Sequence, residues 1–348
     1  MDTALTLVDK LAENGSLSFR EWVTLIDAQS EKLSLYVFEK ARDLQQAYYD
    51  NKIFIRGLIE FTNYCRNDCF YCGIRKSNQA LRRYRLTKEE ILLCCQNGYE
   101  HGFRTFVLQG GEDAYYTDAR MIDIITKIKS DFPDCAITLS IGEKSRESYQ
   151  KFFDAGVSRY LLRHETFDSG HYQLLHPSNL KSQTRQQCLR DLRAIGYQTG
   201  CGFMVGSPYQ TTEHLASDFL FIKELNPHMI GLGPFIPHHD TPFAEKNAGT
   251  LAQTLYLLGL LRIMCPKVLL PATTALGTIA ENGRELGILA GANVIMPNLS
   301  PINHRKDYAL YDNKLTSGAE AAEHIKDLKT RMQHIGYEIV TDRGDSLV

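Results

Sequence analysis

A regular alternation of short apolar segments with longer amphipathic ones constrains the fold of this 348-residue chain more than any other feature. The strand-like segments are 53–61, 105–108, 136–141, 159–162, 199–205, 229–235, 268–272 and 293–296. The helix-like segments lie near 88–101, 119–131, 145–154, 182–195, 212–225, 250–264, 281–289 and 317–335. Because each helix returns the chain to the start of the next strand, this order predicts a parallel sheet.

Eight such units predict an α/β fold, a complete (β/α)8 TIM-type barrel with its chemistry in the loops after the strands. An open doubly wound sheet is the alternative, since periodicity does not show closure. We expect an N-terminal helical extension at 1–50, the barrel at 51–315, and a C-terminal helix and tail packing on the barrel at 316–348. Thr87 and Glu90 have the spacing of a capping box, which predicts a helix start.

Composition excludes several partners. There are 39 basic and 41 acidic side chains, so no strong field is available to attract nucleic acid or an anionic membrane. No apolar run reaches the roughly 18–20 residues of a membrane span, and Met1–Asn14 lacks the basic start of a secretory signal. We therefore expect a cytoplasmic protein. Nine cysteines in a reducing compartment indicate metal ligation or burial rather than disulfides.

Three cysteines directly after the first strand form a metal-ligand motif. Cys65, Cys69 and Cys72 have the spacing C-x3-C-x2-C, and thiolates suit iron–sulfur clusters or zinc. No fourth cysteine lies nearby, and no histidine follows at zinc-finger spacing. Three thiolates on a four-iron cluster leave one iron open to chelate a methionine moiety. With Tyr71 before the last cysteine, the motif resembles that of the radical SAM superfamily, which cleaves S-adenosylmethionine (SAM) to a 5′-deoxyadenosyl radical.

Other readings of the cysteines remain open. The three thiols could hold zinc with a remote fourth ligand, or simply pack in the core. The other cysteines are scattered, and we interpret them as small buried hydrophobic residues: Cys94, Cys95, Cys135, Cys188, Cys201 and Cys265.

Polar residues after later strands suggest where SAM would bind. Gly110-Gly111-Glu112 follows the second strand, and its glycines would let the backbone approach a ligand closely. Glu165 follows the fourth strand, and Arg185 at the next helix could form a bidentate pair with a carboxylate. A turn or a structural ion pair is the alternative for these residues. Met204 could pack on adenine, or simply fill the core.

Two arginines in strands suggest an anionic substrate. Arg56 has the alternation parity of Leu58 and Glu60, so the three side chains should point inward together. A buried arginine needs an anionic partner, and Arg163 on the fourth strand is similar. We expect a carboxylate-bearing substrate, with a structural ion pair as the alternative.

Residues late in the chain could complete the cavity. Thr273 and Thr274 offer hydroxyls after the seventh strand. Tyr308 and Tyr311 could close the cavity from the last connection, or lie on the surface.

The chain resembles the HydE family of [FeFe]-hydrogenase maturases over almost its whole length. The stretches that carry the resemblance are EFTNYCRNDCFYCGIR, RYRLTKEEI, VLQGGED, YLLRHET, GPFIPHHDTP, PATTALGT and GANVIMPN. The cysteine motif alone indicates only the superfamily, whereas YLLRHET, GPFIPHHDTP and PATTALGT together are much more specific.

The resemblance implies a SAM site and a deeper substrate site. SAM would contact Gln109, Gly110, Gly111, Glu112, Thr138, Ser140, Glu165, Arg185 and Met204. The substrate would contact Arg56, Arg163, Thr273, Thr274, Met296 and Tyr308, of which Arg163 and Tyr308 would be catalytic. That substrate would be an iron–carbonyl–cyanide–cysteine precursor from a partner maturase, attacked by the adenosyl radical at sulfur. Contacts with other hydrogenase maturases would be transient.

Two departures from the family pattern matter. Some members carry additional cysteines near the C-terminus for a second cluster, but no cysteine follows Cys265, so we expect one [4Fe–4S] cluster. His176 precedes Pro177 where an arginine is expected, which leaves one contact at the rim open.

The residues are also compatible with two other functions. A methylornithine synthase-like radical SAM mutase would use the two arginines for an amino-acid carboxylate. A non-catalytic iron–sulfur electron carrier or zinc scaffold would need no SAM pocket.

Overall fold

The computed structural model describes residues 2–316 and 324–348. The strands are β1 (Lys52–Ile55), β2 (Gly57–Thr62), β3 (Thr105–Gly110), β4 (Ala136–Ser140), β5 (Arg159–Leu161), β6 (Gln198–Cys201), β7 (Met204–Val205), β8 (Met229–Ile230), β9 (Gly233–Pro234), β10 (Val294–Ile295) and β11 (Glu338–Val340). The helices are α1 (Asp2–Asn14), α2 (Phe19–Asp27), α3 (Glu31–Tyr49), α4 (Lys88–Glu100), α5 (Asp118–Asp131), α6 (Arg146–Asp154), α7 (Ser169–Leu175), α8 (Ser182–Ile195), α9 (Thr212–Leu225), α10 (Leu251–Met264), α11 (Thr274–Ile279), α12 (Gly283–Leu289), α13 (Ile302–Arg305) and α14 (Ile325–His334). The predicted last helix near 317–335 is present from Ile325, and residues 317–323 lie outside the described residues.

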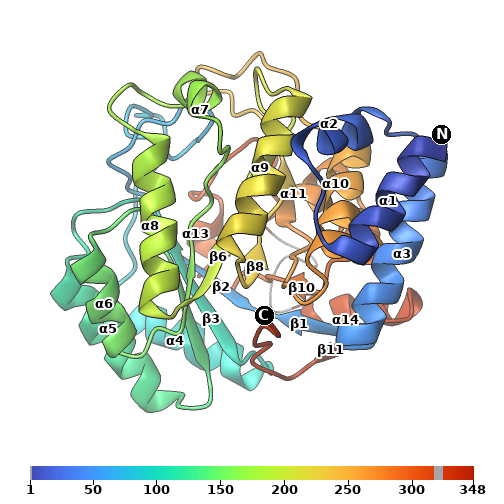
Figure 1. The fold of residues 1–348 in the computed structure, drawn as a ribbon. Coiled ribbons are helices and arrows are strands. Elements are labelled where there is room, and N and C mark those ends of the chain that lie inside the picture. The colour runs from blue at the N-terminus through green and yellow to red at the C-terminus, as the bar shows by residue number, and fades with distance from the viewer. Residues whose placement is uncertain (1, 317–323) are drawn as a thin grey trace.

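The strands pair in parallel, as the alternation predicts. Six form one sheet in the order β2-β3-β4-β5-β6-β8, while β1 lies between β10 and β11, and β7 pairs with β9. The crossover helices α4, α5, α6, α8, α9 and α10 lie outside the strands (Figure 1). The predicted α/β class with a parallel sheet is therefore confirmed.

Backbone links extend the parallel pairing beyond the regular strands. The isolated parallel bridges among the described residues are Met229–Leu269, Pro271–Val294, Leu58–Asn298 and Glu165–Phe203. The predicted strand 268–272 is therefore an extended segment with bridges rather than a regular strand. Pro271 lacks an N–H and cannot donate to a ladder, which shortens the pairing there.

Three predicted strands are interrupted in the structure. The predicted strand 229–235 becomes β8 and β9. The predicted strand 53–61 becomes β1 and β2, which separate at Arg56 because they pair with different partners. The predicted strand 199–205 becomes β6 and β7 around Gly202. Gly202 has φ +154°, and a Cβ there would lie 2.0 Å from the carbonyl oxygen of Gly231. Helices α7, α11 and α13 and strand β11 were not predicted.

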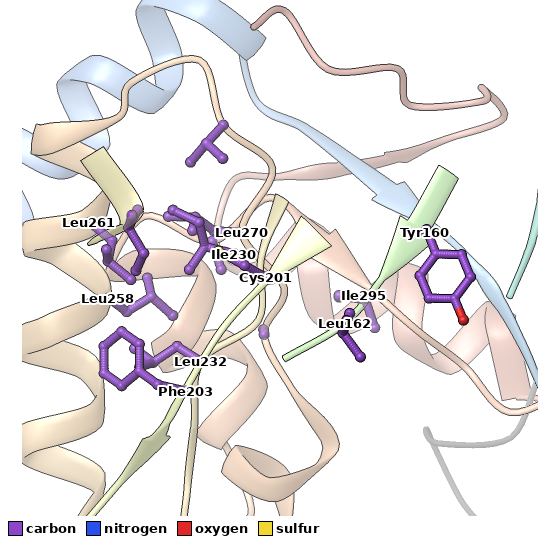
Figure 2. Packing of buried hydrophobic residues seen from close by; sticks show 14 of the residues in the cluster. Tyr160, Leu162, Cys201, Phe203, Ile230, Leu232, Leu258, Leu261, Leu270 and Ile295 are labelled. Carbon is purple, nitrogen blue, oxygen red and sulfur yellow. The ribbon is translucent and has the colours of Figure 1, made fainter. Parts of the chain in front are cut away.

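The core lies between the outer strand faces and the helices. On β4, Ile137 and Leu139 are fully buried in this core, so Thr138 and Ser140 face the other side by alternation. Figure 2 shows Leu258 of α10 beside residues from several strands. Burying one such aliphatic side chain contributes about 1.5–3 kcal/mol, so this layer fixes which strand face points inward.

The three N-terminal helices pack against this layer. Trp22 of α2 packs against Phe219 of α9 with ring centroids 4.2 Å apart and the ring planes tilted by 33°, and Tyr256 of α10 donates its hydroxyl to the Leu25 carbonyl. These contacts hold α2 against α9 and α10, two of the crossover helices. Among the described helices, none combines the length and the apolarity that crossing a bilayer requires.

Candidate active site

A cavity of about 360 Å³ opens where the parallel strands end. It is lined by these residues expected at the site: Cys65, Cys69, Cys72, Gln109, Gly110, Gly111, Glu112, Ser140, Arg163, Glu165, Arg185, Met204, Thr273, Thr274, Met296 and Tyr308. Tyr311 also lines it. Because the carboxyl ends of parallel strands meet at one edge, loops far apart in sequence converge here. Two expected residues, Thr138 and Arg56, are not on its wall.

The cysteine loop, between β2 and α4, is wrapped around one guanidinium group. Arg83 donates to four backbone carbonyls, from Asn63, Ile74, Arg75 and Asn78. A loop without regular structure needs such partners for its carbonyl groups. The Arg66 N–H also donates to the Glu112 carbonyl at 3.0 Å, which joins this loop to the Gly-Gly-Glu loop.

The three thiols fit a thiolate-bound cluster. Cys65, Cys69 and Cys72 line the same cavity and are free of disulfides. Burial raises the pKa of Cys69 to about 12 and raises the pKa of Cys72 well above its usual value, and the neighbouring thiols add to both shifts. Such thiols stay protonated at neutral pH unless a metal displaces the proton, as iron does when it binds. Of the other six cysteines, Cys265 is partly buried and the rest are buried, as expected.

The Gly-Gly-Glu loop lies tight against the cysteine loop. A Cβ on Gly111 would fall 2.2 Å from the Tyr64 carbonyl oxygen, so only glycine fits. The Glu112 carboxylate accepts from Arg66 Nε at 2.9 Å and from the Glu143 N–H at 3.0 Å. Arg185 lies 3.8 Å away on the other side. Glu112 is therefore held in one position at the cavity wall.

Arg185 and Arg163 place two guanidinium groups at the cavity. Arg185 donates to Glu143 Oε1 at 2.6 Å and to the Arg163 carbonyl at 3.1 Å. Arg163 Nη2 lies 3.1 Å from Glu165 Oε2. Met204 packs beside them with aromatic residues, including Phe235. The cavity therefore combines paired charges with an apolar patch, which suits a ligand that carries both.

Hydroxyl groups occupy the deeper wall. Ser140 lines the cavity, and Thr138 lies on the same strand face two residues deeper. The Oγ1 atoms of Thr138 and Thr273 are buried without a hydrogen-bond partner. Tyr308 is almost fully buried, and burial raises its pKa, so its phenol is neutral. Unpartnered buried hydroxyls are costly, so they mark positions where a bound polar group would be stabilised.

The structure adds an ion pair that the sequence did not predict. Lys314 donates to Glu60 Oε1 at 2.6 Å and to the Tyr308 carbonyl at 3.1 Å, and both ionic side chains line the cavity. Asn298 donates to the other Glu60 oxygen at 2.8 Å. Glu60 faces inward as its parity predicts. Lys314 lies in an irregular segment 254 residues away, where no periodic pattern signals contact. Glu143 was also missed, although it follows a strand.

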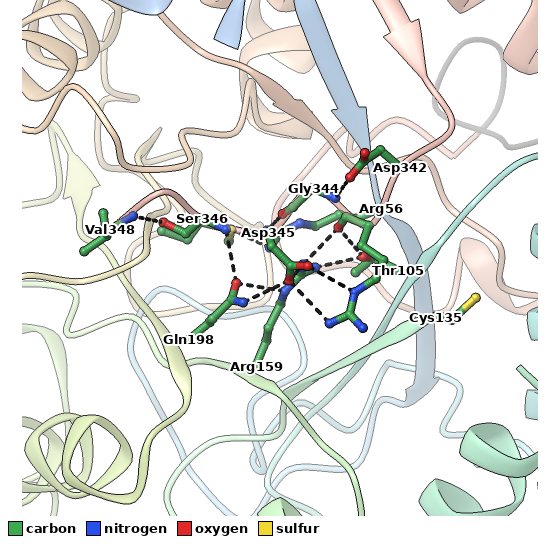
Figure 3. Close-up of polar contacts among 12 residues, drawn as sticks. Arg56, Thr105, Cys135, Arg159, Gln198, Asp342, Gly344, Asp345, Ser346 and Val348 are labelled. Atoms are coloured by element: carbon green, nitrogen blue, oxygen red, sulfur yellow. Dashed lines mark hydrogen bonds and ion pairs between the residues drawn. The ribbon is translucent and has the colours of Figure 1, made fainter. Parts of the chain in front are cut away.

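Arg56 lies in a different environment from the substrate cavity in which we expected it. Its Nη1 lies 2.8 Å from Met229 Sδ and its Nη2 3.5 Å from the Gly344 carbonyl oxygen. Figure 3 shows Arg56 and Arg159 beside Asp345 of the C-terminal residues. Parity placed Arg56 on the inner face, but it lies at the opposite end of the strands from the cysteines. The carboxylate that acts on Arg56 is Asp345 of the chain itself.

His176 lies behind the cavity wall. Its Nδ1 donates to the Tyr172 carbonyl at 2.9 Å, which leaves Nε2 to accept from the Tyr71 hydroxyl at 3.0 Å. The histidine thus supports the aromatic residue that precedes Cys72 and does not line the cavity. A separate group, His238, His239 and Asp312, could hold a metal ion, but Asp312 already accepts from His239 Nδ1 and N–H.

This fold and site define a radical SAM enzyme. The Radical SAM superfamily model matches residues 59–222. The chain is 45% identical over 279 residues to the [FeFe] hydrogenase maturase subunit HydE of Thermotoga maritima, covering 80% of this chain and 79% of that protein. The chain belongs to this HydE family of hydrogenase maturases.

A second group of relatives is more distant. The 3-methylornithine synthase of Methanosarcina barkeri is 28% identical over 347 residues, covering 97% of this chain and 94% of that protein. The crystal structure of methylornithine synthase (PylB) superposes with a TM-score of 0.82 at 25% identity, covering 96% of this chain and 97% of that one. The radical SAM and HydE interpretations of the sequence are confirmed, and membership implies a [4Fe–4S] cluster and SAM.

Proposed function

We propose that Cys65, Cys69 and Cys72 hold a single [4Fe–4S] cluster at the mouth of the cavity. The observation that carries this proposal is that the three thiols share one cavity wall with the expected SAM residues. The bound cluster would supply an electron and an open iron for reductive cleavage of SAM. The residues of the chain would bind and orient SAM at the cavity.

The SAM residues would act as follows. Glu112, fixed by Arg66 and the Glu143 N–H, would accept from the amino group of SAM. Arg185 would pair with the methionine carboxylate, and Glu165 would accept from the ribose hydroxyls. Met204 would pack on adenine. Of the rest of this set, the wall would be shaped by Gln109, Gly110, Gly111 and Ser140, and Thr138 would lie beneath Ser140 on the same strand face.

The substrate would bind deeper. Binding of SAM by Glu165 would free Arg163, now 3.1 Å from that carboxylate, for an anionic substrate group. The hydroxyls of Thr273 and Thr274 and the side chains of Met296 and Tyr308 would complete the site. We propose Arg163 and Tyr308 as catalytic residues. The substrate class is a small iron–carbonyl–cyanide–cysteine species, received through transient contact with other hydrogenase maturases.

We also propose that the parallel strands close into a complete barrel. The bridges Met229–Leu269, Pro271–Val294 and Leu58–Asn298 support a complete (β/α)8 barrel spanning 51–315. Residues 1–50 would form its helical extension, and 316–348 its C-terminal helix and tail. A cytoplasmic location follows, because thiolates that must bind iron need a reducing compartment.

Anaerobic turnover with SAM and dithionite tests the cluster assignment. We expect wild-type protein to bind about four irons and to yield 5′-deoxyadenosine and methionine, and the Cys69→Ala variant to yield neither product. Cys265→Ala, a partly buried cysteine outside the cavity, serves as the matched control and should retain both iron and products. Zinc binding without SAM cleavage in the wild type would overturn the proposal.

Methylornithine synthase chemistry is the second candidate, favoured by the relative that covers 97% of the chain. Incubation of the reduced protein with SAM and lysine separates the two functions. Methylornithine as product would replace our choice, whereas activation of [FeFe]-hydrogenase without that product supports it.

A further inference from the structure

The turn that presents Glu165 has a strained backbone. Glu165 has φ +66°, in the left-handed region that side chains with a Cβ rarely adopt. Its N–H donates to the Gly202 carbonyl at 3.0 Å, and its carbonyl accepts from the Met204 N–H at 3.4 Å. Strained residues persist only where their surroundings determine them, so other contacts must hold this turn.

The next contact is made by His164, whose side chain points away from the cavity. The Gly202 N–H donates to His164 Nδ1 at 3.3 Å, so the ring proton is on Nε2. Nε2 lies 3.2 Å from Asp218 Oδ1 on α9, and both side chains are fully buried. The Asp218 carboxylate therefore contacts the imidazole of His164, the residue directly before Glu165.

Asp218 also contacts the other side of the turn. Its Oδ1 accepts from the Phe167 N–H at 2.6 Å. One carboxylate oxygen thus bridges residues 164 and 167, and Glu165 lies between them on the cavity side. The bridge fixes the chain on both sides of the strained residue.

A buried carboxylate at this position needs an explanation. The ring of Phe221 lies 5.0 Å from His164, and α9 has apolar neighbours on either side of Asp218. Burial raises the pKa of Asp218, which expresses the cost of removing the charge from water. An apolar residue would pack there without that cost. In the described part of the chain, the Phe167 N–H donates to this carboxylate and His164 Nε2 lies within ion-pair distance of it, and these two contacts offset the cost.

We propose that Asp218 and His164 are positioning residues for SAM, which hold the Glu165 carboxylate at the cavity in its binding orientation. The inference rests on the proposed function, in which Glu165 accepts from the ribose hydroxyls. It assigns a binding effect to a helix residue that does not itself line the cavity.

The test is a double-mutant cycle on SAM affinity, measured anaerobically by equilibrium binding to the reconstituted protein. Asp218→Asn keeps one oxygen as the acceptor toward both Phe167 and His164 but removes its negative charge. We expect it to weaken SAM binding about tenfold, as replacing a charge-assisted hydrogen bond by a neutral one would, with iron content unchanged. In a Glu165→Ala background the same change should cost nothing further.

Alternative outcomes separate the two proposals. Equal losses from Asp218→Asn in both backgrounds, or no loss in either, would overturn the positioning role. Wild-type SAM affinity in Glu165→Ala alone would instead overturn the SAM site itself.

Two variants of His164 test the positioning role independently if Asp218→Asn fails to fold. His164→Gln keeps a donor toward Asp218, so we expect it to bind SAM nearly as tightly as wild type. His164→Leu lacks that donor and should show the tenfold loss of SAM affinity. Equal SAM affinity in the two variants would overturn the positioning role.

Discussion

At the scale of single residues, the C-terminal Asp345 shows how a charge at one end of the chain stabilises a distant strand. Arg159 at the start of β5 donates to Asp345 Oδ1 at 2.6 Å and to the Arg343 carbonyl at 2.9 Å. Gln198 donates to the same carboxylate at 2.9 Å. Arg159 is almost fully buried, so these acceptors compensate the removal of its charge from water.

A pH dependence follows for Asp345. Burial acts to raise its pKa, but the charge and hydrogen bond of Arg159 outweigh burial and lower the pKa to about 2 from the usual 3.8. Its stabilising effect is therefore fully present above about pH 4 and is lost as pH falls through about 2. We expect Asp345→Asn to lower the urea midpoint of the metal-free protein at pH 5, by a difference that shrinks toward pH 3.

The exposed Asp123, paired with Lys88 on the surface, provides the matched control for that measurement. Asp123→Asn should change the midpoint little at any pH, since exposed ion pairs contribute only about 0–1 kcal/mol. A pH-independent difference between wild type and Asp345→Asn would contradict the assigned cause.

At the scale of elements, α4 begins where the cysteine loop ends. The capping box predicted from Thr87 and Glu90 is formed: the Glu90 N–H donates to Thr87 Oγ1 at 3.2 Å, and the Thr87 N–H donates to Glu90 Oε2 at 2.7 Å. Two backbone N–H groups that no helical carbonyl can reach are thereby satisfied. The cap determines where the loop ends and the helix starts.

Loss of this cap should be measurable. Thr87→Ala is expected to lower the free energy of unfolding by about 1 kcal/mol, measured by urea denaturation of the metal-free protein. Thr330→Ala, an equally exposed threonine inside α14, makes the same chemical change without a cap and should stay within about 0.5 kcal/mol of wild type. Equal losses of unfolding free energy from the two changes would contradict a stabilising role of the cap.

At the scale of the whole molecule, the two ends of the parallel strands have different tasks. The cavity opens at the carboxyl ends, and the C-terminal residues pack against the amino ends, where Thr105, Arg159 and Arg56 contact residues 343–345 (Figure 3). Such folds separate residues for chemistry from residues for stability in this way.

Deletion of residues 341–348 tests that separation. We expect the free energy of unfolding to fall by at least about 3 kcal/mol, because buried guanidinium groups lose their acceptors. Below the new melting temperature, SAM affinity and iron content should match wild type. Deletion of Leu347 and Val348 alone, which are exposed, should have a much smaller effect. A selective loss of SAM binding with unchanged stability would contradict the separation.

Local patterns were sufficient for much of this protein. Thiolate spacing predicted Cys65, Cys69 and Cys72 at one cavity, because ligands a few residues apart share one loop. Alternation predicted the inward face of Glu60, and strand–helix order predicted where the polar loops meet. These features depend on neighbours in sequence or on the direction of parallel strands, which a sequence carries directly.

Tertiary structure decided what depends on distant partners. Arg56 has the alternation parity of a cavity residue. Parity predicts which face of the strand a side chain lies on but not how far along the strand the cavity extends, and the Arg56 guanidinium contacts the Gly344 carbonyl near the C-terminus. Lys314 reaches Glu60, and Asp218 reaches His164, through contacts between segments with no shared pattern. The alternation of strand-like and helix-like segments therefore determined the fold class and the end of the strands where chemistry occurs. Packing between remote segments determined which charges meet there, because ion pairing depends on distance in space and not on separation in sequence.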